Sequence, residues 1–434
     1  MTYPETVSYL YAQLPAFQKI GKEAMKPSLD NIKAICYHLG NPQDSFPSIH
    51  VAGTNGKGSS CHMLASVLQE AGYKVGLYTS PHLKDFRERF RINGKLVKEE
   101  LVTAFVENHK NFIEELKPSF FEVTVALAFD IFAKEAVDFA IIETGLGGRL
   151  DSTNVIQPIV SLITNIGYDH MDVLGSTLPL IAAEKGGIIK KGVPVVISER
   201  NTETDEVFMD LARQNNSSIT FAQDKYAILE SKECSSSTTY VVNDLSDSLT
   251  QTYTYNLDLK GNYQEYNLLG VLAILGILEN INAISINKLD ISNGVANVIL
   301  NTGLRGRWQT LGLSPRIITD TGHNSHAFNV LKDQISQYND ERCHFILGFA
   351  SDKDMSRVLE FLPKASKYYF CTFNSPRSQT GETLKRNAIN FNINEAEFFH
   401  DVNIALESVK KHAKKEDFIF IGGSTYLVAE LENL

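Results

Sequence analysis

Short apolar runs alternate along the first half of the chain with longer stretches in which apolar residues recur at helical spacing. The runs are continuous, which is typical of strands buried on both faces of a parallel sheet. Strand–helix alternation indicates an α/β fold. After two helical stretches within residues 1–48, we predict strands at 48–52, 73–79, 137–142, 158–163 and 193–197, and helices at 59–71, 99–116, 121–136 and 178–189.

The pattern changes in the second half. Residues 201–260 are rich in Ser, Thr, Tyr and Asn, and we predict short antiparallel strands there, as an edge sheet or flap. At about 100–200 residues per domain, 434 residues suggest two or three domains. We predict two, 1–298 and 299–434, with a hinge at 301–306. A predicted helix at 266–278 is followed by predicted strands at 316–319, 343–347, 368–372 and 417–421.

Composition narrows the classes of function. The chain has 41 Lys and Arg against 51 Asp and Glu, a formal net charge of −10, which argues against a non-specific nucleic-acid binder. Its five cysteines are scattered without a CxxC pair, so neither a disulfide framework nor a zinc site is predicted, and a reducing cytoplasm is expected. The first residues show no signal-peptide pattern, and no apolar run reaches the ~18 residues that a membrane span needs.

The strongest local motif is the glycine-rich segment Gly53–Ser59, between a predicted strand and a predicted helix. Its glycines let successive N–H groups point at one centre, while the helix N-terminus and Lys57 add positive charge. Such a loop binds a polyphosphate, and Ser59 can reach Mg²⁺. The spacing departs from the standard P-loop, because Val51 replaces its first glycine and Gly58 its Ser or Thr. The alternative is a glycine-rich turn with an exposed lysine.

Polar side chains also follow three other predicted strands. Ser80 comes after the strand at 73–79, Glu143 after 137–142 and His170 after 158–163. Because the carboxyl ends of parallel strands share one edge of a sheet, these groups are expected beside the phosphate loop as metal ligands. Taken singly, such a histidine is more often structural and such a glutamate more often a salt-bridge partner.

Two further clusters are ambiguous from the residues alone. Lys185 is near the end of a predicted helix, where a lysine normally interacts with the helix dipole. In the second predicted domain, Arg305 and Arg307 stand beside Trp308, and Asp320 ends a predicted strand. An arginine can clamp a phosphate and an aspartate can bind a ribose, but an ordinary turn with surface arginines is the alternative.

These motifs, in order along nearly the whole chain, resemble folylpolyglutamate synthase and bifunctional dihydrofolate synthase of the Mur ligase superfamily. The matching segments are GTNGKGS at 53–59, TSPHL at 79–83, ETGLGGRLDSTN at 143–154, IGYDHMDVLG at 166–175, AAEKGGIIK at 182–190 and GGSTYLVAE at 422–430. The resemblance implies a P-loop ATPase domain with a mostly parallel sheet and a small antiparallel flap, followed by a smaller Rossmann-like glutamate-ligase domain.

The activity that the resemblance implies is ATP-dependent amide formation, with Mg²⁺ as cofactor. ATP phosphorylates the carboxylate of dihydropteroate or a reduced folate, and the amine of L-glutamate attacks the acyl phosphate. A cytoplasmic monomer with no nucleic-acid or membrane partner is expected. Two alternatives stay open: a ligase for a cell-wall precursor, disfavoured by the short segment before Gly53, and a nucleotide-dependent switch that forms no product.

The resemblance also assigns site residues. ATP contacts are Thr54, Asn55, Gly56, Lys57, Gly58, Ser59, Asn267, Arg307, Asp320 and His323. Metal contacts are Ser80, Glu143 and His170, with Ser59 as a further one. Catalytic residues are Lys57, His170 and Lys185, the last as a carbamylated lysine. Contacts with the pteroate are Ser119, Phe120, Phe121, Glu122, Leu150, Asp151 and Ser152.

The chain departs from the family pattern in the second domain. Leu304–Arg307 replaces Trp-Pro-Gly-Arg, and Asp320–Ser325 replaces Asp-Gly-Ala-His-Asn-Pro. Loss of the proline before Arg307 is expected to loosen the hinge. The arginine and the aspartate are kept, so activity is expected to be retained.

Overall fold

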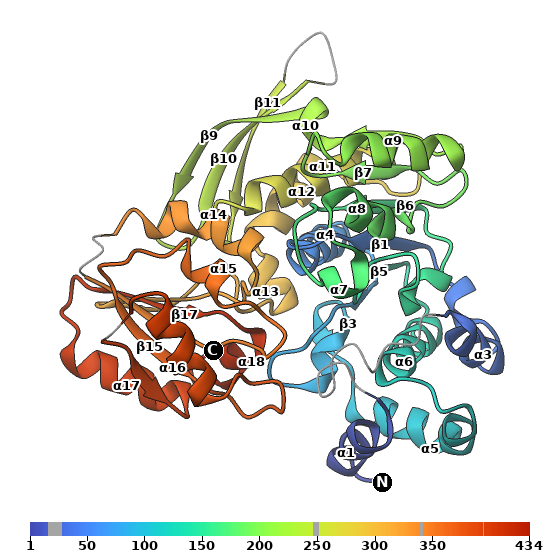
Figure 1. Cartoon of the computed structure of the whole chain (residues 1–434). Helices are drawn as coiled ribbons and strands as arrows, with labels where there is room; N and C mark the ends of the chain where they lie inside the picture. Colours follow the sequence, from blue (N-terminus) through green and yellow to red (C-terminus); the bar gives the residue numbers. More distant parts are fainter. Residues whose placement is uncertain (16–27, 246–250, 339–341, 394) are drawn as a thin grey trace. The chain divides into compact units, whose positions relative to one another are not determined.

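A computed structural model describes residues 1–434 except 16–27, 246–250, 339–341 and 394. The described residues form two compact units (Figure 1). The second unit consists of Leu259–Tyr263 and Arg305–Leu434, and the first holds the other described residues. The predicted domain limit at 298/299 falls within helix α13, Val298–Thr302, which belongs to the first unit.

The first unit is built on an eight-stranded sheet with the order β4-β3-β2-β5-β1-β6-β7-β8. The neighbouring strands β2, β5, β1, β6, β7 and β8 are parallel to one another. Strands β3 and β4 continue the sheet beyond β2 as an antiparallel edge. The central strands are buried along their whole length, as their continuous apolar sequences predict. The strands are β1 (Ser48–Ala52), β2 (Val75–Tyr78), β3 (Phe90–Ile92), β4 (Lys95–Leu96), β5 (Phe139–Glu143), β6 (Val160–Ile163), β7 (Val195–Ile197) and β8 (Ile219–Phe221).

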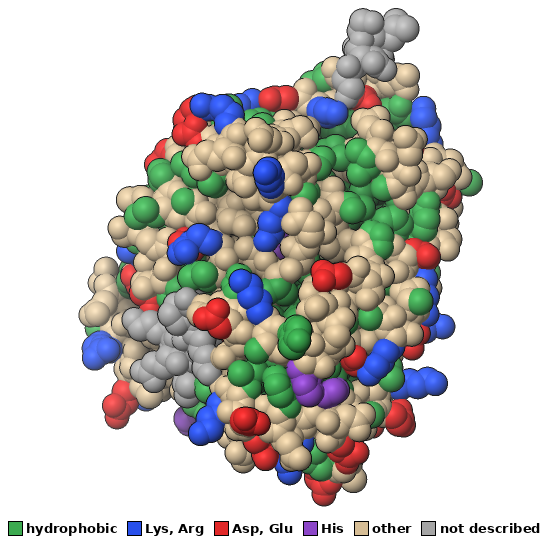
Figure 2. Space-filling model, turned by 90° about the vertical axis from the view of Figure 1, so that its right-hand side faces the viewer, with side chains coloured by type: hydrophobic (Ala, Val, Ile, Leu, Met, Phe, Trp, Pro, Cys, Tyr) green, Lys and Arg blue, Asp and Glu red, His purple; other side chains and the backbone are tan. Residues whose placement is uncertain are grey.

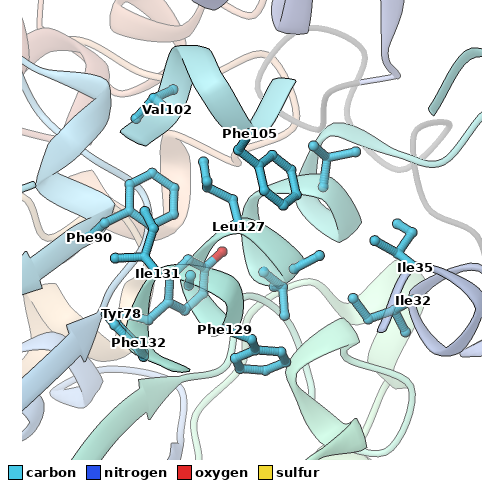
Figure 3. Packing of buried hydrophobic residues seen from close by; sticks show 14 of the residues in the cluster. Ile32, Ile35, Tyr78, Phe90, Val102, Phe105, Leu127, Phe129, Ile131 and Phe132 are labelled. Atoms are coloured by element: carbon cyan, nitrogen blue, oxygen red, sulfur yellow. The ribbon is translucent and has the colours of Figure 1, made fainter. Parts of the chain in front are cut away.

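The helices of the first unit bury the faces of this sheet. Helix α6 lies in a core cluster in which Leu127, Phe129 and Phe132 pack among side chains from β2, β3, α3 and α5 (Figure 3). The helices are α1 (Tyr3–Gln13), α3 (Asp30–His38), α4 (Lys57–Glu70), α5 (Glu99–Leu116), α6 (Phe120–Lys134), α7 (Met171–Leu174), α8 (Leu178–Gly186), α9 (Asp205–Gln214), α10 (Ala222–Lys225), α11 (Gln264–Asn280), α12 (Lys288–Ala296) and α13.

The prediction of antiparallel strands throughout 201–260 is wrong for its first part. Residues Asp205–Gln214 form α9, and β8 extends the parallel sheet beside β7. The polar composition of the whole region concealed the helical spacing of Phe208 and Ala212, which are buried. The predicted antiparallel sheet exists further on, with the order β11-β10-β9. Its strands are β9 (Tyr226–Glu233), β10 (Thr238–Asp244) and β11 (Gln251–Leu257).

The second unit contains a six-stranded sheet with the order β12-β13-β17-β14-β15-β16. All pairs are parallel except β12 with β13, and core clusters cover both faces. The α/β class with mostly parallel sheets is therefore confirmed in both units. The strands are β12 (Gln309–Leu313), β13 (Arg316–Thr319), β14 (Cys343–Leu347), β15 (Lys367–Cys371), β16 (Glu397–Phe399) and β17 (Phe418–Gly422). The helices are α14 (Ser325–Ile335), α15 (Ser356–Leu359), α16 (Gly381–Asn390), α17 (Val402–His412) and α18 (Thr425–Glu430).

The surface shows mixed charge. Figure 2 shows a face on which Lys and Arg side chains are interspersed with Asp and Glu side chains. Among the described residues, no helix combines the length and the hydropathy that crossing a bilayer requires.

Candidate active site

The predicted site residues of the first unit follow neighbouring strands. Strands β2, β5, β1 and β6 are adjacent, and Val51 of β1 is level with Glu143 of β5. Ser80 follows β2, Gly53 follows β1, and the segment 165–170 follows β6. The carboxyl ends of four parallel strands thus bring these groups to one edge, where open α/β sheets bind ligands.

The glycine-rich loop has the backbone that its sequence predicts. Gly53 has φ +147° and Gly56 has φ +82°, and α4 begins directly at Lys57, with Gly58 in its first turn. A Cβ on Gly53 would lie 1.8 Å from Thr164 Oγ1, and one on Gly56 would lie 2.2 Å from Asn267 Oδ1. Both positions therefore require glycine, and the loop leads into a helix N-terminus, which favours an anion.

The segment after β6 holds this loop in place. The Asn55 N–H donates to Asn165 Oδ1 at 3.0 Å, and Thr164 Oγ1 donates to the Asn55 carbonyl at 2.6 Å. The Thr54 hydroxyl bonds to both the carbonyl and the N–H of Gly167, at 3.2 and 2.9 Å. Sequence analysis missed Thr164 and Asn165 as positioning residues, although Asn165 directly precedes the family-like segment at 166–175.

Lys57 and Lys185 meet at one backbone oxygen. Lys57 Nζ donates to the Gly53 carbonyl at 3.0 Å, and Lys185 Nζ donates to the same carbonyl at 2.8 Å. Lys185 is in the last turn of α8, yet it is only 4% exposed and contacts the phosphate loop. Burial, followed by the charge of Lys57, lowers the pKa of Lys185 to about 7, and Asp169 and Asp151 oppose this shift. Lys185 therefore does more than interact with the dipole of α8, because it also contacts the phosphate loop.

The predicted metal ligands combine a carboxylate, a hydroxyl group and an imidazole. Glu143 is 5% exposed, and its Oε2 accepts from the Ser80 N–H at 2.9 Å. His170 caps the start of α7 in a left-handed conformation, with φ +49°. Among the described residues, no group of three or more His, Cys, Asp and Glu side chains can hold a metal by itself. This set still fits Mg²⁺, which is usually held by one or two carboxylates together with water and substrate phosphates.

A buried polar cluster joins α4 to α11. Ser59 is 1% exposed and accepts from Gln264 Nε2 at 3.3 Å, and Asn267 Nδ2 donates to Gln264 Oε1 at 2.8 Å. The predicted ATP residue Asn267 is thereby brought against Gly56. Gln264, which sequence analysis missed, fixes the orientation of both partners; it is 205 positions from Ser59 and carries no local signal.

The predicted pteroate residues at 119–122 lie at the start of α6, and Glu122 Oε2 also accepts from Asn31 Nδ2 of α3 at 3.3 Å. Ser119 and Glu122 form a capping box, with Ser119 N–H to Glu122 Oε2 at 2.6 Å. Phe120 is buried, whereas Phe121 is half-buried and lies against Gly145, where a Cβ would be 2.4 Å from its ring. Phe121 is thus the member of this segment that reaches the loop after β5.

Asp151 organises that loop. Its Oδ2 accepts from the N–H groups of Gly145 and Leu146, each at 2.8 Å, and its Oδ1 accepts from the N–H and hydroxyl groups of Thr153 at 3.0 and 2.5 Å. Burial raises the pKa of Asp151, and these hydrogen bonds oppose the shift. The neighbours Leu150 and Ser152 are half-buried. The carboxylate therefore shapes the loop whether or not it also contacts a substrate.

The predicted residues of the second unit cluster at the end of β13. Asp320 is 4% exposed and accepts from the Trp308 N–H at 2.8 Å, from the Tyr263 hydroxyl at 2.7 Å and from the Gly322 N–H at 2.7 Å. Arg307 donates to the Thr321 hydroxyl. His323 Nδ1 lies 3.0 Å from the Thr321 carbonyl oxygen. The structure brings Arg307, Asp320 and His323 together, and their role as ATP contacts stays a prediction.

Comparisons with known proteins cover both units. Residues 51–275 match the Mur ligase middle domain, and residues 306–425 match the Mur ligase glutamate ligase domain. The dihydrofolate synthase/folylpolyglutamate synthase of Bacillus subtilis is 31% identical, over 99% of this chain and 98% of that protein, and that of Escherichia coli is 30% identical, over 99% and 96%. The structure of E. coli FolC in complex with DHPP and ADP has a TM-score of 0.84 at 28% identity, covering 99% of this chain and 96% of the other. A likeness of this extent in both sequence and fold shows that the chain belongs to the dihydrofolate synthase/folylpolyglutamate synthase family of Mur ligases.

Proposed function

We propose that the edge formed by the phosphate loop, Ser80, Glu143, His170 and Lys185 carries out the reaction of the family. As a member of that family, the chain is an ATP-dependent, ADP-forming ligase that joins L-glutamate to the carboxylate of a pteroate or folate. The observation that carries the assignment of the site is the convergence of Lys57 and Lys185 on the Gly53 carbonyl. It joins a phosphate loop to a second, buried amine at the edge where Glu143 lies.

The reaction needs charge neutralisation and alignment. A carboxylate oxygen of the acceptor attacks the γ-phosphorus of ATP, the bond to the β-phosphate oxygen breaks, and ADP leaves. The amine of glutamate then attacks the acyl carbon, loses a proton and expels phosphate. The N–H groups of the loop and the ammonium group of Lys57 hold the polyphosphate and offset its charge, which is the dominant protein contribution to phosphoryl transfer.

Lys185 is proposed to act as a carbamate. A neutral amine reacts with CO₂ to form R–NH–COO⁻ and releases one proton. The pKa of about 7 leaves a substantial fraction of Lys185 neutral at physiological pH, because burial and Lys57 disfavour the ammonium form. The product carries negative charge beside Lys57, so repulsion between two cations becomes attraction.

Ser80, Glu143, His170 and Ser59 are proposed to hold Mg²⁺, with the carbamate as a further oxygen ligand. Bound Mg²⁺ supplies neutralisation of phosphate charge. Glu143 provides the full negative charge of this set, and its hydrogen bond with the Ser80 N–H fixes both residues relative to each other.

The acceptor is proposed to lie between the start of α6 and the loop at 145–152. Phe121 offers an aromatic face there, and Asp151 keeps the loop in shape. The remaining predicted members, Ser119, Phe120, Glu122, Leu150 and Ser152, frame these two elements.

One experiment tests the proposed function. The purified protein is given ATP, Mg²⁺ and L-glutamate with either dihydropteroate or a reduced folate, and ADP release and product mass are followed. A product heavier by one glutamyl residue with either acceptor supports the proposal, and the two acceptors show whether the chain is bifunctional. Release of no ADP with both would contradict it. A cytoplasmic, monomeric enzyme is proposed, and its oligomeric state follows from light scattering of the same sample.

A further inference from the structure

Arg89 is a buried cation whose side-chain partners, among the described residues, are neutral. It ends the short 3₁₀ helix Phe86–Arg89 and is 2% exposed. Its Nε donates to His82 Nδ1 at 2.9 Å, and its guanidinium group lies 5.4 Å from the centre of the Phe120 ring. The Tyr78 hydroxyl group interacts with it as well. Among the described carboxylates, none forms an ion pair with Arg89.

The nearby carboxylates have other partners. Asp85 pairs with Arg87 at 2.7 Å, and Glu88 accepts from the N–H groups of Leu83 and Lys84. A buried charge without a counter-charge costs several kcal/mol. A fold keeps such a group only where something else offsets this cost, and a bound anion is a direct way to do so.

The surroundings hold the Arg89 side chain in one position. The Tyr11 hydroxyl lies 3.2 Å from His82 Nε2, and the Tyr11 ring stacks on Phe120 at 4.6 Å. An imidazole, two aromatic rings and a guanidinium group are thus ordered together. This degree of ordering is expected of a recognition site rather than of a solvated surface arginine.

The cluster is continuous with the proposed active site. The Thr79 N–H donates to the Arg89 carbonyl at 3.3 Å, so Arg89 lies opposite the residue that precedes Ser80. The Tyr78 ring, which contacts Arg89, lies 6.3 Å from the Phe121 ring, and Phe121 packs on Gly145. An anion at Arg89 would therefore lie beside the aromatic face proposed for the acceptor.

We propose that Arg89, positioned by His82 and Tyr11, binds a carboxylate of the acceptor substrate. This inference rests on the proposed function, because it takes the acceptor to be an aromatic acid of the pteroate or folate class. Two carboxylates qualify: the one that is phosphorylated, present in every acceptor, and the α-carboxylate of a glutamyl tail, present in folates alone. A guanidinium group matches a carboxylate in shape and charge.

The test compares Arg89→Gln and Arg89→Lys with Arg87→Gln, a control in the same turn whose arginine already has a carboxylate partner. Binding of dihydropteroate, a reduced folate and a pteroic carboxamide, which lacks the charge, is measured by calorimetry, together with KM and kcat for both acids. Melting temperatures identify any variant that fails to fold. If Arg89→Gln fails to fold, Arg89→Lys, which keeps the positive charge, still tests the proposal.

We expect Arg89→Gln to weaken acid binding by about 10–100-fold, the value of a charge-assisted hydrogen bond. ATP binding and carboxamide binding stay unchanged, and Arg89→Lys loses less. If the affinities for dihydropteroate and for the reduced folate fall equally, Arg89 binds the carboxylate that is phosphorylated. If only the affinity for the folate falls, Arg89 binds the α-carboxylate of the glutamyl tail. Unchanged acid binding, or an equal loss for the carboxamide, overturns the proposal. Calorimetry measures binding of the acids independently of catalysis. If the wild-type protein binds the acids but forms no product, the proposed function is contradicted and the proposal for Arg89 is not.

Discussion

Lys57 and Lys185, which are 128 positions apart in the sequence, donate hydrogen bonds to the same carbonyl oxygen, that of Gly53, at 3.0 and 2.8 Å. One oxygen can offset only part of two positive charges, so the pair favours loss of a proton from the more buried lysine. Lys185 is that residue, and its pKa falls to about 7. The arrangement therefore prepares one cation for a polyphosphate and one neutral amine for chemistry.

The first prediction concerns Lys57. We expect Lys57→Ala to lower ADP formation by at least ~10²–10³-fold, because the transferred phosphoryl group loses a positive charge next to the loop. ATP binding weakens as well, since the loop N–H groups remain but the ammonium group does not. Steady-state ADP release and calorimetric ATP binding measure both effects. Lys191→Ala, at an exposed lysine in the same unit, is the control and keeps wild-type rates. ADP formation by Lys57→Ala at a rate near that of wild type would remove the phosphate-loop assignment.

The second prediction separates two effects of replacing a glycine by alanine in a turn: backbone strain and a steric clash of the new Cβ with a neighbour. Gly56 and Gly72 both have positive φ, +82° and +88°, so alanine costs roughly 1 kcal/mol or more of backbone strain at either position. A Cβ on Gly56 would collide with Asn267 Oδ1 at 2.2 Å, whereas nothing lies within 4 Å of one on Gly72.

We expect Gly56→Ala to weaken ATP binding by more than tenfold and Gly72→Ala to leave it unchanged, with both variants losing stability. Calorimetry with ATP and a denaturant titration give the two quantities. Equal ATP affinities for the two variants would mean that the contact between Gly56 and Asn267 has no part in nucleotide binding.

The sequence predicted best those features whose chemistry is local. Gly53–Ser59 combines residue types that few structures other than a phosphate loop require, and continuous apolar runs located the central strands. Helix α9 was missed because the polar composition of its surroundings outweighed two buried positions, Phe208 and Ala212. The average hydropathy of a segment reflects its composition only. Whether the segment packs as a helix depends on apolar residues recurring on one face.

Sequence analysis identified the residues of the motifs as candidates for the site. It missed the residues that hold those motifs in position. Asn165 and Gln264 act through partners that are distant in the sequence, so no local pattern marks them. Asp151 is a different case. A motif marked it as a substrate contact, which stays a prediction, and the direction of the Gly145 and Leu146 N–H groups, which only the folded backbone reveals, gives its carboxylate a further role in the loop itself.

The third prediction follows from that role of Asp151. In Asp151→Asn, one acceptor oxygen becomes an NH₂ group that faces N–H donors, so at least one buried hydrogen bond is lost. We expect a loss of about 1–3 kcal/mol in the free energy of unfolding and a higher KM for the acceptor, with the KM for ATP unchanged. Chemical denaturation and steady-state kinetics measure these effects. A variant with wild-type stability and a raised acceptor KM would instead show that Asp151 acts on the substrate alone.

The fourth prediction concerns the pH dependence that Lys185 imposes on stability. Its pKa is about 7 in the folded chain and 10.5 as the unperturbed value. Between these pH values the unfolded state binds more protons than the native state, so stability rises with pH over this range. The cost of burying the charge is complete below pH 7 and amounts to as much as about 5 kcal/mol at 1.36 kcal/mol per pKa unit.

Lys185→Met removes the buried charge and nearly keeps the volume, so we expect it to unfold at higher denaturant concentration than wild type in CO₂-free buffer. Its advantage should be largest at or below pH 7 and should disappear as the pH approaches 10.5, because Lys185 is then neutral in both states. Adding bicarbonate near pH 8 should stabilise wild type and leave Lys185→Met unchanged, since only the lysine forms a carbamate. The variant should form no product with or without bicarbonate. A difference in stability that is independent of pH would show that Lys185 keeps its proton in the folded protein, and a carbamate at this position would then lack the neutral amine it requires.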